Sequence, residues 1–301
     1  HNRPNYLHDL ISIIGKRSYI LYFHNDPLTM SGSKSINERK LLLKNTYKIL
    51  FNSNWSKKRF LEGMPNSFVN SEKLNVIFQS AKKQKVNINN KKKLITFVGK
   101  LNKSKGYDIF GKTIIKILNN FNDWKASVVG DEARDKIFFK HKNLKIHGFL
   151  EHKKVLDIYK NTSIAVVCSR WEEPFGRTSL EASSNGCAVI ISNKGGLPET
   201  ITNGIILKNL SVKYLYKEIK ELILNNKKRK YLQSLSQKNF YLTNKFVSNL
   251  IDECRSEKLK YFNNFNIKKD KKLRILHVTN FNERHDGRLF FNTGRRLNNG
   301  F

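Results

Sequence analysis

The chain has 301 residues and a mass of 35.2 kDa, which is enough for two domains that each bury a core. Its 39% hydrophobic and 27% charged residues are typical of a globular protein and exclude a fibrous or largely disordered one. No run of about 18 apolar residues is present, so no membrane-spanning helix is expected. The sequence starts with His1 and has no charged-then-apolar leader, so we expect part of a longer protein without a secretion signal.

Positive charge dominates the composition. Lysine and arginine number 57 against 24 acidic residues, a formal net charge of +33. Such a charge attracts polyanions, including nucleic acid, anionic lipid and phosphorylated substrates. The lysines are spread over every segment and form no basic stripe interleaved with aromatic residues. We therefore interpret most of them as solvated surface charge and expect no nucleic-acid partner.

The first part of the chain alternates short apolar runs with helical patterns. The expected strands are residues 19–23, 47–51 and 74–78, and the expected helices are residues 35–45 and 55–63. A polar, lysine-rich stretch at residues 80–93 follows, which we interpret as a linker. Residues 1–85 are therefore predicted to form a partial, truncated N-terminal domain of the Rossmann-like type.

The same alternation continues more regularly after the linker. We expect strands at residues 94–98, 126–129, 144–147, 163–168 and 187–192, and helices at residues 107–118, 152–160, 177–185 and 212–224. Near-continuous apolar strands separated by helices favour a doubly wound α/β domain with a parallel sheet, here residues 86–250. Two basic helices, at residues 227–235 and 239–258, are expected to follow without strands.

The end of the chain allows two interpretations. Residues 251–272 are expected to hold the end of a helix and a charged linker, and residues 273–279 have a new strand pattern. Residues 273–301 either begin a further module or supply a strand to the N-terminal domain. We favour the first interpretation, because so short a segment cannot replace everything that the N-terminal domain lacks.

The most informative segment follows the strand at residues 163–168. It contains EPFGRTSLEA, in which Pro174 suits the entry to a helix that opens near Gly176. The unpaired backbone amides of the first turn, together with the helix dipole, make a binding site for phosphate. We assign this site to the backbone of four consecutive residues: Phe175, Gly176, Arg177 and Thr178.

Two carboxylates belong to the same segment. Glu173 lies just before the helix and Glu181 lies inside it, with seven residues between them. This spacing places Glu173 at the reacting end of a bound phosphate compound and Glu181 where a carboxylate can accept hydrogen bonds from a ribose diol. Taken alone, the two are equally well explained as ordinary acids near a helix N-terminus.

A second candidate anion site follows the strand at residues 94–98. There the loop reads GKLNKSKG, with Gly99 at a close turn and two lysines, Lys100 and Lys105. Two ammonium groups at this end of the sheet can neutralise a diphosphate from the side opposite the helix amides. The functional interpretation is preferred to that of two more surface lysines because both anion sites fall at the same end of the sheet.

Together with the GGLPE turn at residues 195–199, these motifs resemble the retaining glycosyltransferases of family 4 (group 1), which have the GT-B fold of two Rossmann-like domains. The similarity covers roughly residues 1–250 and is greatest to bacterial enzymes that build lipopolysaccharide and other surface polysaccharides. It implies that Glu173 contacts the transferred sugar, that Glu181 holds the ribose, and that Lys100 and Lys105 hold the diphosphate. Arginine is usual in the family at the position of Lys100, and lysine keeps the charge without the bidentate fork.

The resemblance also implies two further contacts. The loop at Phe149 and Leu150 corresponds to the place where such enzymes hold the nucleobase through backbone atoms. His24, in FHNDPLTM after the first expected strand, matches the N-domain histidine of the family and is predicted to approach the sugar. From the spacing alone, His24 is equally well explained as a structural histidine in the turn before Pro27.

Metal and redox chemistry are not indicated. No pair of acids has DxD spacing and no His/Cys cluster has ligand spacing, so we expect a metal-independent enzyme without a cofactor, in which amides and lysines neutralise the diphosphate. Cys168, Cys187 and Cys254 have no paired spacing and are typical of reduced thiols in a cytosolic protein.

The sequence thus predicts a cytoplasmic, retaining glycosyltransferase of the hexosyltransferase type. Its donor would be a nucleotide-diphosphate sugar and its acceptor a saccharide or a lipid-linked saccharide, in cell-surface polysaccharide synthesis. The KKRK run at residues 227–230 is interpreted as a solvated helix face, with peripheral docking to an anionic membrane as the sharper alternative. The competing hypothesis is a non-catalytic basic protein of the same fold that binds polyanions or membrane surfaces.

Overall fold

The computed structural model describes residues 3–15, 17–134 and 137–259. The described residues up to Arg255 belong to one compact unit. The strand expected at residues 273–279, and with it both interpretations of residues 273–301, falls outside the described residues.

A three-stranded parallel sheet organises the first part of the chain. Its order is β1-β2-β3, with strands β1 (Tyr19–Phe23), β2 (Thr46–Phe51) and β3 (Leu74–Val76). The accompanying helices are α1 (Pro4–Ile14), α2 (Ile36–Asn45) and α3 (Asn54–Leu61). Leu21 and Phe23 point to the same face as Phe51 and pack with Leu7 of α1 and Phe60 of α3 into one core. Helix α1 was not predicted from the sequence.

Serine residues begin two of these helices. Ser35 forms a capping box with Glu38 at the start of α2, and Ser53 accepts a hydrogen bond from the Ser56 amide at the start of α3. Each cap satisfies an amide that has no partner inside its helix. Only two residues, Asn52 and Ser53, separate the end of β2 from the first residue of α3.

A six-stranded parallel sheet organises the second part, in the order β6-β5-β4-β7-β8-β9. The strands are β4 (Lys92–Val98), β5 (Lys125–Val129), β6 (Leu144–Ile146), β7 (Thr162–Val167), β8 (Ala188–Ser192) and β9 (Ile205–Leu207). This is the doubly wound order, in which the direction of winding reverses between β4 and β7. Ligands of such sheets bind beyond the carboxyl ends of the strands at this switch point.

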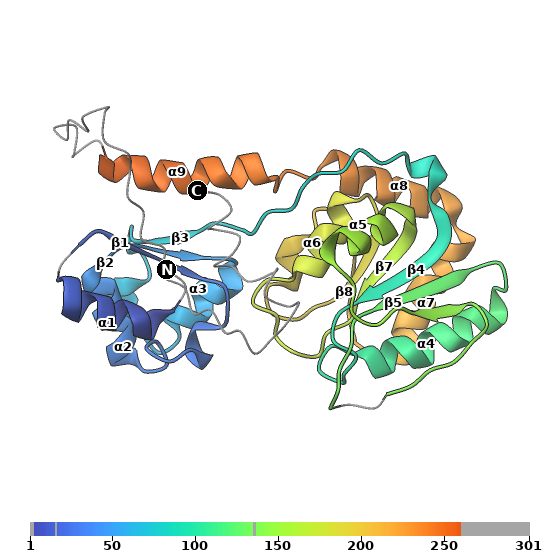
Figure 1. Cartoon of the computed structure of the whole chain (residues 1–301), viewed down its shortest axis with the longest axis horizontal. Coiled ribbons are helices and arrows are strands. Elements are labelled where there is room, and N and C mark those ends of the chain that lie inside the picture. The colour runs from blue at the N-terminus through green and yellow to red at the C-terminus, as the bar shows by residue number, and fades with distance from the viewer. Residues whose placement is uncertain (1–2, 16, 135–136, 260–301) are drawn as a thin grey trace. The chain divides into compact units, whose positions relative to one another are not determined.

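Helices cover both faces of the larger sheet (Figure 1). Ile164 and Val166 of β7 face the core shared with α4 (Tyr107–Asn120) and α7 (Val212–Leu224). Ala165 and Val167 face the opposite core, shared with α5 (His152–Asn161) and α6 (Arg177–Ser184). The apolar, non-alternating sequence of β7 follows from this burial on both faces. Helices α8 (Asn226–Lys238) and α9 (Asn244–Leu259) complete the described chain.

The elements differ from the sequence prediction in detail at three places. The stretch predicted as a linker, residues 80–93, contains a 3-10 turn at Ile88–Asn90, and its last two residues already belong to β4, which begins at Lys92. Within it, the buried Ala81 donates its amide to the Leu242 carbonyl. The helix expected from residue 239 begins at Asn244, because Phe240 and Leu242 alternate into a core that also contains Phe175. Strand β9 was not predicted from the sequence.

Candidate active site

A hollow of about 220 Å³ lies at the switch point of the larger sheet. Its lining comes from the ends of β4 and β7, from the β4–α4 loop, from the loop before α6 and from the start of that helix. The lining residues are Phe97, Val98, Gly99, Lys105, Val167, Ser169, Glu173, Gly176, Arg177 and Thr178. The position agrees with the expectation that a ligand binds beyond the carboxyl ends of the parallel strands.

An ion pair occupies this hollow. The Lys105 ammonium lies 2.5 Å from Oε1 of Glu173, whose side chain is largely buried. The same ammonium lies 4.8 Å from the centre of the exposed Trp171 ring, a cation–π distance. The turn that carries Lys105 is tight at the next residue, Gly106, where φ is +72° and a Cβ would lie 1.8 Å from the Cys168 carbonyl oxygen. The chain therefore requires glycine where the β4–α4 loop passes the end of β7.

The two predicted lysines have different surroundings. Lys105 lines the hollow, whereas the Lys100 side chain is exposed and does not line it. Gly99, the residue before Lys100, does line it, and its amide donates to the Val129 carbonyl at the end of β5. Of the predicted basic pair, the structure brings Lys105 alone to Glu173.

Helix α6 begins beside the ion pair. Its N-cap is Gly176, so no side chain caps the first turn. Gly176 has φ +129°, and a Cβ there would lie 2.4 Å from the Leu197 side chain. The side chain of Phe175 points away from the hollow into the core around Leu50 and stacks on Phe78. Only the backbone amide of Phe175 is thus available to a ligand in the hollow, and this amide is the group that the sequence analysis assigned to the phosphate site.

Glu181 lies one turn further along α6 and does not line the hollow. Its Oε1 accepts hydrogen bonds from Nε2 of His152, at 3.0 Å, and from Nη2 of Arg177, at 2.9 Å. Burial raises the pKa of the Glu181 carboxyl, but the hydrogen bond from His152 and the charge of Arg177 outweigh it and hold the pKa below its ordinary value. Glu181 is therefore an anion held in place on the α6 side of the hollow.

His152 was not predicted as a site residue. It is the first residue of α5 and follows the predicted nucleobase loop by one residue. In that loop the Phe149 side chain is half exposed, and Leu150 packs against the core shared by α5 and α6. A histidine at the start of a helix is a weak signal by itself, and its contact with Glu181 joins residues that are 29 positions apart.

His24 follows β1 and does not line the hollow. Its Nδ1 lies 2.9 Å from Nε2 of Gln79, and its backbone carbonyl accepts from Nδ2 of Asn52 at 3.0 Å. Burial lowers the pKa of His24 to about 4, and the positive charge of Arg177 acts in the same direction. Arg177, the first residue of α6, thus acts on the charge of His24, although His24 follows a strand of the smaller sheet and α6 packs on the larger one.

Two features are absent from the part of the chain that the structure describes. Within residues 3–15, 17–134 and 137–259, no group of three His, Cys, Asp or Glu side chains could hold a metal ion. In the same part of the chain, none of the helices combines the length and the apolar character that crossing a bilayer requires.

Comparison with solved structures identifies the fold. Anabaena Alr3699/HepE in complex with UDP superposes with a TM-score of 0.71 at 18% identity, over 83% of this chain and 75% of that one. A glycosyltransferase from Rickettsia africae superposes with a TM-score of 0.65, also at 18% identity, over 88% of this chain and 76% of that one. The chain has the GT-B fold of these glycosyltransferase structures, with parallel sheets and α/β layers.

Sequence comparison identifies the family. The family model "Glycosyl transferases group 1" matches residues 78–239, more than half of the chain, which therefore belongs to that family. Among curated relatives, spore coat protein SA of Bacillus subtilis is 28% identical over 49% of this chain and 44% of its own length. The lipopolysaccharide core biosynthesis mannosyltransferase LpsB of Rhizobium meliloti is 29% identical over 38% of this chain and 35% of its own length. The matched part thus spans less than half of either relative.

Proposed function

We propose that the chain is part of a retaining glycosyltransferase that transfers a sugar from a nucleotide-diphosphate sugar to an acceptor hydroxyl. The observation that carries this proposal is the Lys105–Glu173 ion pair beside the uncapped start of α6, at the switch point of the larger sheet. A cation and free helix amides that flank one hollow are suited to a diphosphate. An acid in the same hollow is suited to the sugar attached to that diphosphate.

Each remaining residue of the site would bind a different part of the donor. The amides of the first turn of α6 and the Lys105 ammonium would hold the diphosphate and stabilise the charge that develops on it as the sugar departs. Glu181, oriented by His152 and Arg177, would accept hydrogen bonds from the ribose diol. Glu173 would face the transferred sugar, and His24 would approach that sugar from the end of β1. A departing phosphate oxygen would then take the proton of the acceptor hydroxyl.

The class of acceptor is proposed from the relatives. LpsB is named as a mannosyltransferase of lipopolysaccharide core biosynthesis, and two other relatives are named as proteins of a cps region in Klebsiella pneumoniae. We infer a saccharide or a lipid-linked saccharide of a surface polysaccharide as acceptor. The large net positive charge of +33 suits an acceptor that is anionic or attached to an anionic surface.

The test begins with binding. A panel of nucleoside diphosphates and their sugars, measured by calorimetry in the presence of EDTA, is expected to contain a ligand that binds saturably without metal. The product formed from that donor is then analysed by NMR, and retention at the anomeric carbon is expected. A salt titration distinguishes this proposal from the competing hypothesis of a non-catalytic polyanion-binding protein. The proposal would be overturned if the chain bound a polyanion with an affinity that falls steeply with salt and bound no sugar nucleotide.

A further inference from the structure

Two adjacent residues link the loop of His24 to the loop of Glu173. Asn52 and Ser53 follow β2 directly, and both side chains are fully buried. Nδ2 of Asn52 donates to the His24 carbonyl at 3.0 Å, and the Ser53 hydroxyl donates to the Pro174 carbonyl at 2.6 Å. A dipeptide that belongs to neither loop therefore holds the backbone next to both side chains that we place at the sugar.

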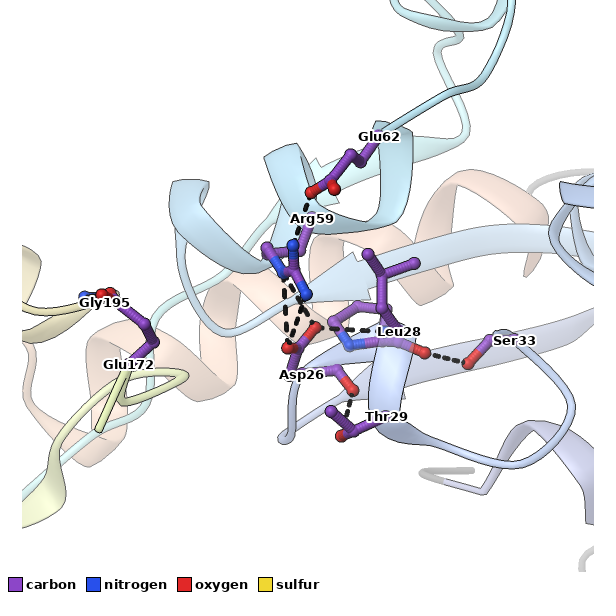
Figure 2. Close-up of polar contacts among 9 residues, drawn as sticks. Asp26, Leu28, Thr29, Ser33, Arg59, Glu62, Glu172 and Gly195 are labelled. Carbon is purple, nitrogen blue, oxygen red and sulfur yellow. Dashed lines mark hydrogen bonds and ion pairs between the residues drawn. The ribbon is translucent and has the colours of Figure 1, made fainter. Parts of the chain in front are cut away.

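The contact on the His24 side is fixed by several bonds. The side chain of Asn52 holds the His24 carbonyl, and the backbone amide of Asn52 donates to the Phe23 carbonyl at 3.2 Å. The side-chain oxygen Oδ1 of Asn52 also accepts from the Ser56 hydroxyl at 2.8 Å. Arg59, further along α3, binds the carboxylate of Asp26 at 3.2 Å, two residues beyond His24 (Figure 2). Asp26 in turn accepts the Leu28 amide and thereby orders the turn after His24.

The contact on the Glu173 side is equally built. The Ser53 oxygen accepts from the Ser56 amide at 2.9 Å while its proton goes to Pro174, so one hydroxyl both caps α3 and holds the loop. The Glu199 carboxylate accepts from the Asn54 and Trp55 amides at 2.7 and 2.9 Å. This charge lies at the N-terminus of α3, where the helix dipole favours an anion.

The turn that carries Glu199 also touches the Glu173 backbone. The Gly196 amide donates to the Glu173 carbonyl at 2.6 Å. Gly195 has φ +58°, and a Cβ at this position would lie only 2.2 Å from the same carbonyl oxygen, so the turn requires glycine. The start of α3, the GGLPE turn and the residues 173–174 are thus one hydrogen-bonded junction. A shift of α3 must move the Glu173 backbone or break these bonds.

We propose that Asn52 and Ser53 are positioning residues that set His24 and Glu173 relative to one another through the start of α3. The inference rests on the proposed function, because the two side chains are given a common substrate there. Reacting groups have to be held within fractions of an ångström, and a misplacement of 1 Å costs on the order of a hundredfold in rate. Neither residue needs to touch the donor.

The decisive variant is Ser53→Gly, with Ser35→Gly as its matched control. Glycine is nearly as good an N-cap as serine, so both changes cost only a few tenths of a kcal/mol of helix capping. Ser35 caps α2 through its box with Glu38, and its hydrogen bonds are with Glu38 and Arg39 of the same helix. Only Ser53→Gly is therefore expected to lower kcat, by roughly tenfold, while the Kd for uridine diphosphate changes by less than about twofold. Ser53→Thr keeps the hydroxyl and should restore the rate.

Hydrogen exchange gives a second measure that does not depend on activity. In Ser53→Gly, peptides covering residues 172–176 and 195–199 are expected to exchange faster than in the unchanged protein and in Ser35→Gly. Asn52→Ala should speed exchange at residues 24–29 in the same way. Faster exchange confined to α3, or an equal loss of kcat in Ser35→Gly, would overturn the positioning role. If the unchanged protein transfers no sugar, the proposed function fails, and the exchange pattern still decides whether the junction holds both loops.

Discussion

The Lys105 ammonium and the Glu173 carboxylate lie 2.5 Å apart in the hollow at the switch point of the larger sheet. The cation that we assign to the diphosphate is thus paired with the acid that we assign to the sugar. When a donor binds, its phosphate oxygens must compete with Glu173 for this ammonium or share it. The energetics of donor binding therefore include the loss or rearrangement of a partly buried ion pair.

Glu173→Gln removes the competitor of the phosphate and keeps the shape of the side chain. We expect the nucleoside diphosphate that the panel identifies to bind at least as tightly as in the unchanged protein, whereas transfer falls by about a hundredfold because the group facing the sugar has lost its charge. Calorimetry and initial rates measure the two effects. Glu221→Gln, which removes an exposed acid paired with Lys228, is the control and should change neither. A loss of nucleotide affinity in Glu173→Gln would contradict the competition.

The two lysines of the GKLNKSKG loop are expected to differ in weight. Lys105→Met should weaken nucleoside diphosphate binding by roughly tenfold or more, since it removes the ammonium in the hollow. Lys100→Met should weaken it by less than about threefold, because an exposed charge outside the hollow acts through screened solvent. Kd values of both variants at 50 and 300 mM salt test whether Lys105 contributes more than Lys100. Equal losses of affinity would contradict this difference and would support the assignment of both lysines to the diphosphate that the family resemblance implies.

Glu181 is expected to depend on His152. His152→Phe removes a hydrogen bond that lowers the Glu181 pKa and should weaken nucleotide binding by roughly tenfold or more, in proportion to a lost hydrogen bond to a charged group. Because the folded-state pKa of Glu181 lies below its unfolded value, its charge stabilises the fold above the unfolded pKa, and this contribution is lost as pH falls through the folded value. Denaturant unfolding of Glu181→Gln should therefore differ from the unchanged protein at pH 7, and the difference should shrink as the pH falls below the ordinary pKa of a glutamate.

His24 is expected to be neutral throughout the physiological range. Its pKa of about 4 lies below the ordinary 6.5, so the unfolded chain binds this proton before the folded chain does as pH falls. Between pH 6.5 and 4 the unfolded state holds more of this proton, so the contribution of His24 to the free energy of unfolding decreases with decreasing pH in that window. An NMR titration of the His24 ring should give a midpoint well below 6.5 and no midpoint between pH 6 and 8. A midpoint near 6.5 would show that the ring is not buried in solution.

Sequence patterns predicted all three strands of the smaller sheet and five of the six strands of the larger one. The apolar strands of residues 92–98, 162–167 and 188–192 are visible because both of their faces are buried, and the α6 segment is visible because its motif is local. Helix α1 escaped prediction because it buries only Pro4 and Leu7. His152, Asn52 and Ser53 carry no local signal, since what distinguishes them are bonds to residues 28 to 121 positions away. Lys100 and Lys105 look alike in the sequence, and only the path of the loop separates them.

The Trp171 ring beside the Lys105 ammonium gives the protein an optical reporter of its own site. Of the three tryptophans in the chain, Trp124 is buried against Arg229 and Trp55 lies near Arg59, so both keep a cationic neighbour that belongs to the fold. Only the neighbour of Trp171 is a group that we expect to engage a phosphate. Movement of that ammonium changes the field over the indole and hence its emission, so occupancy of the hollow can be followed by fluorescence without any label.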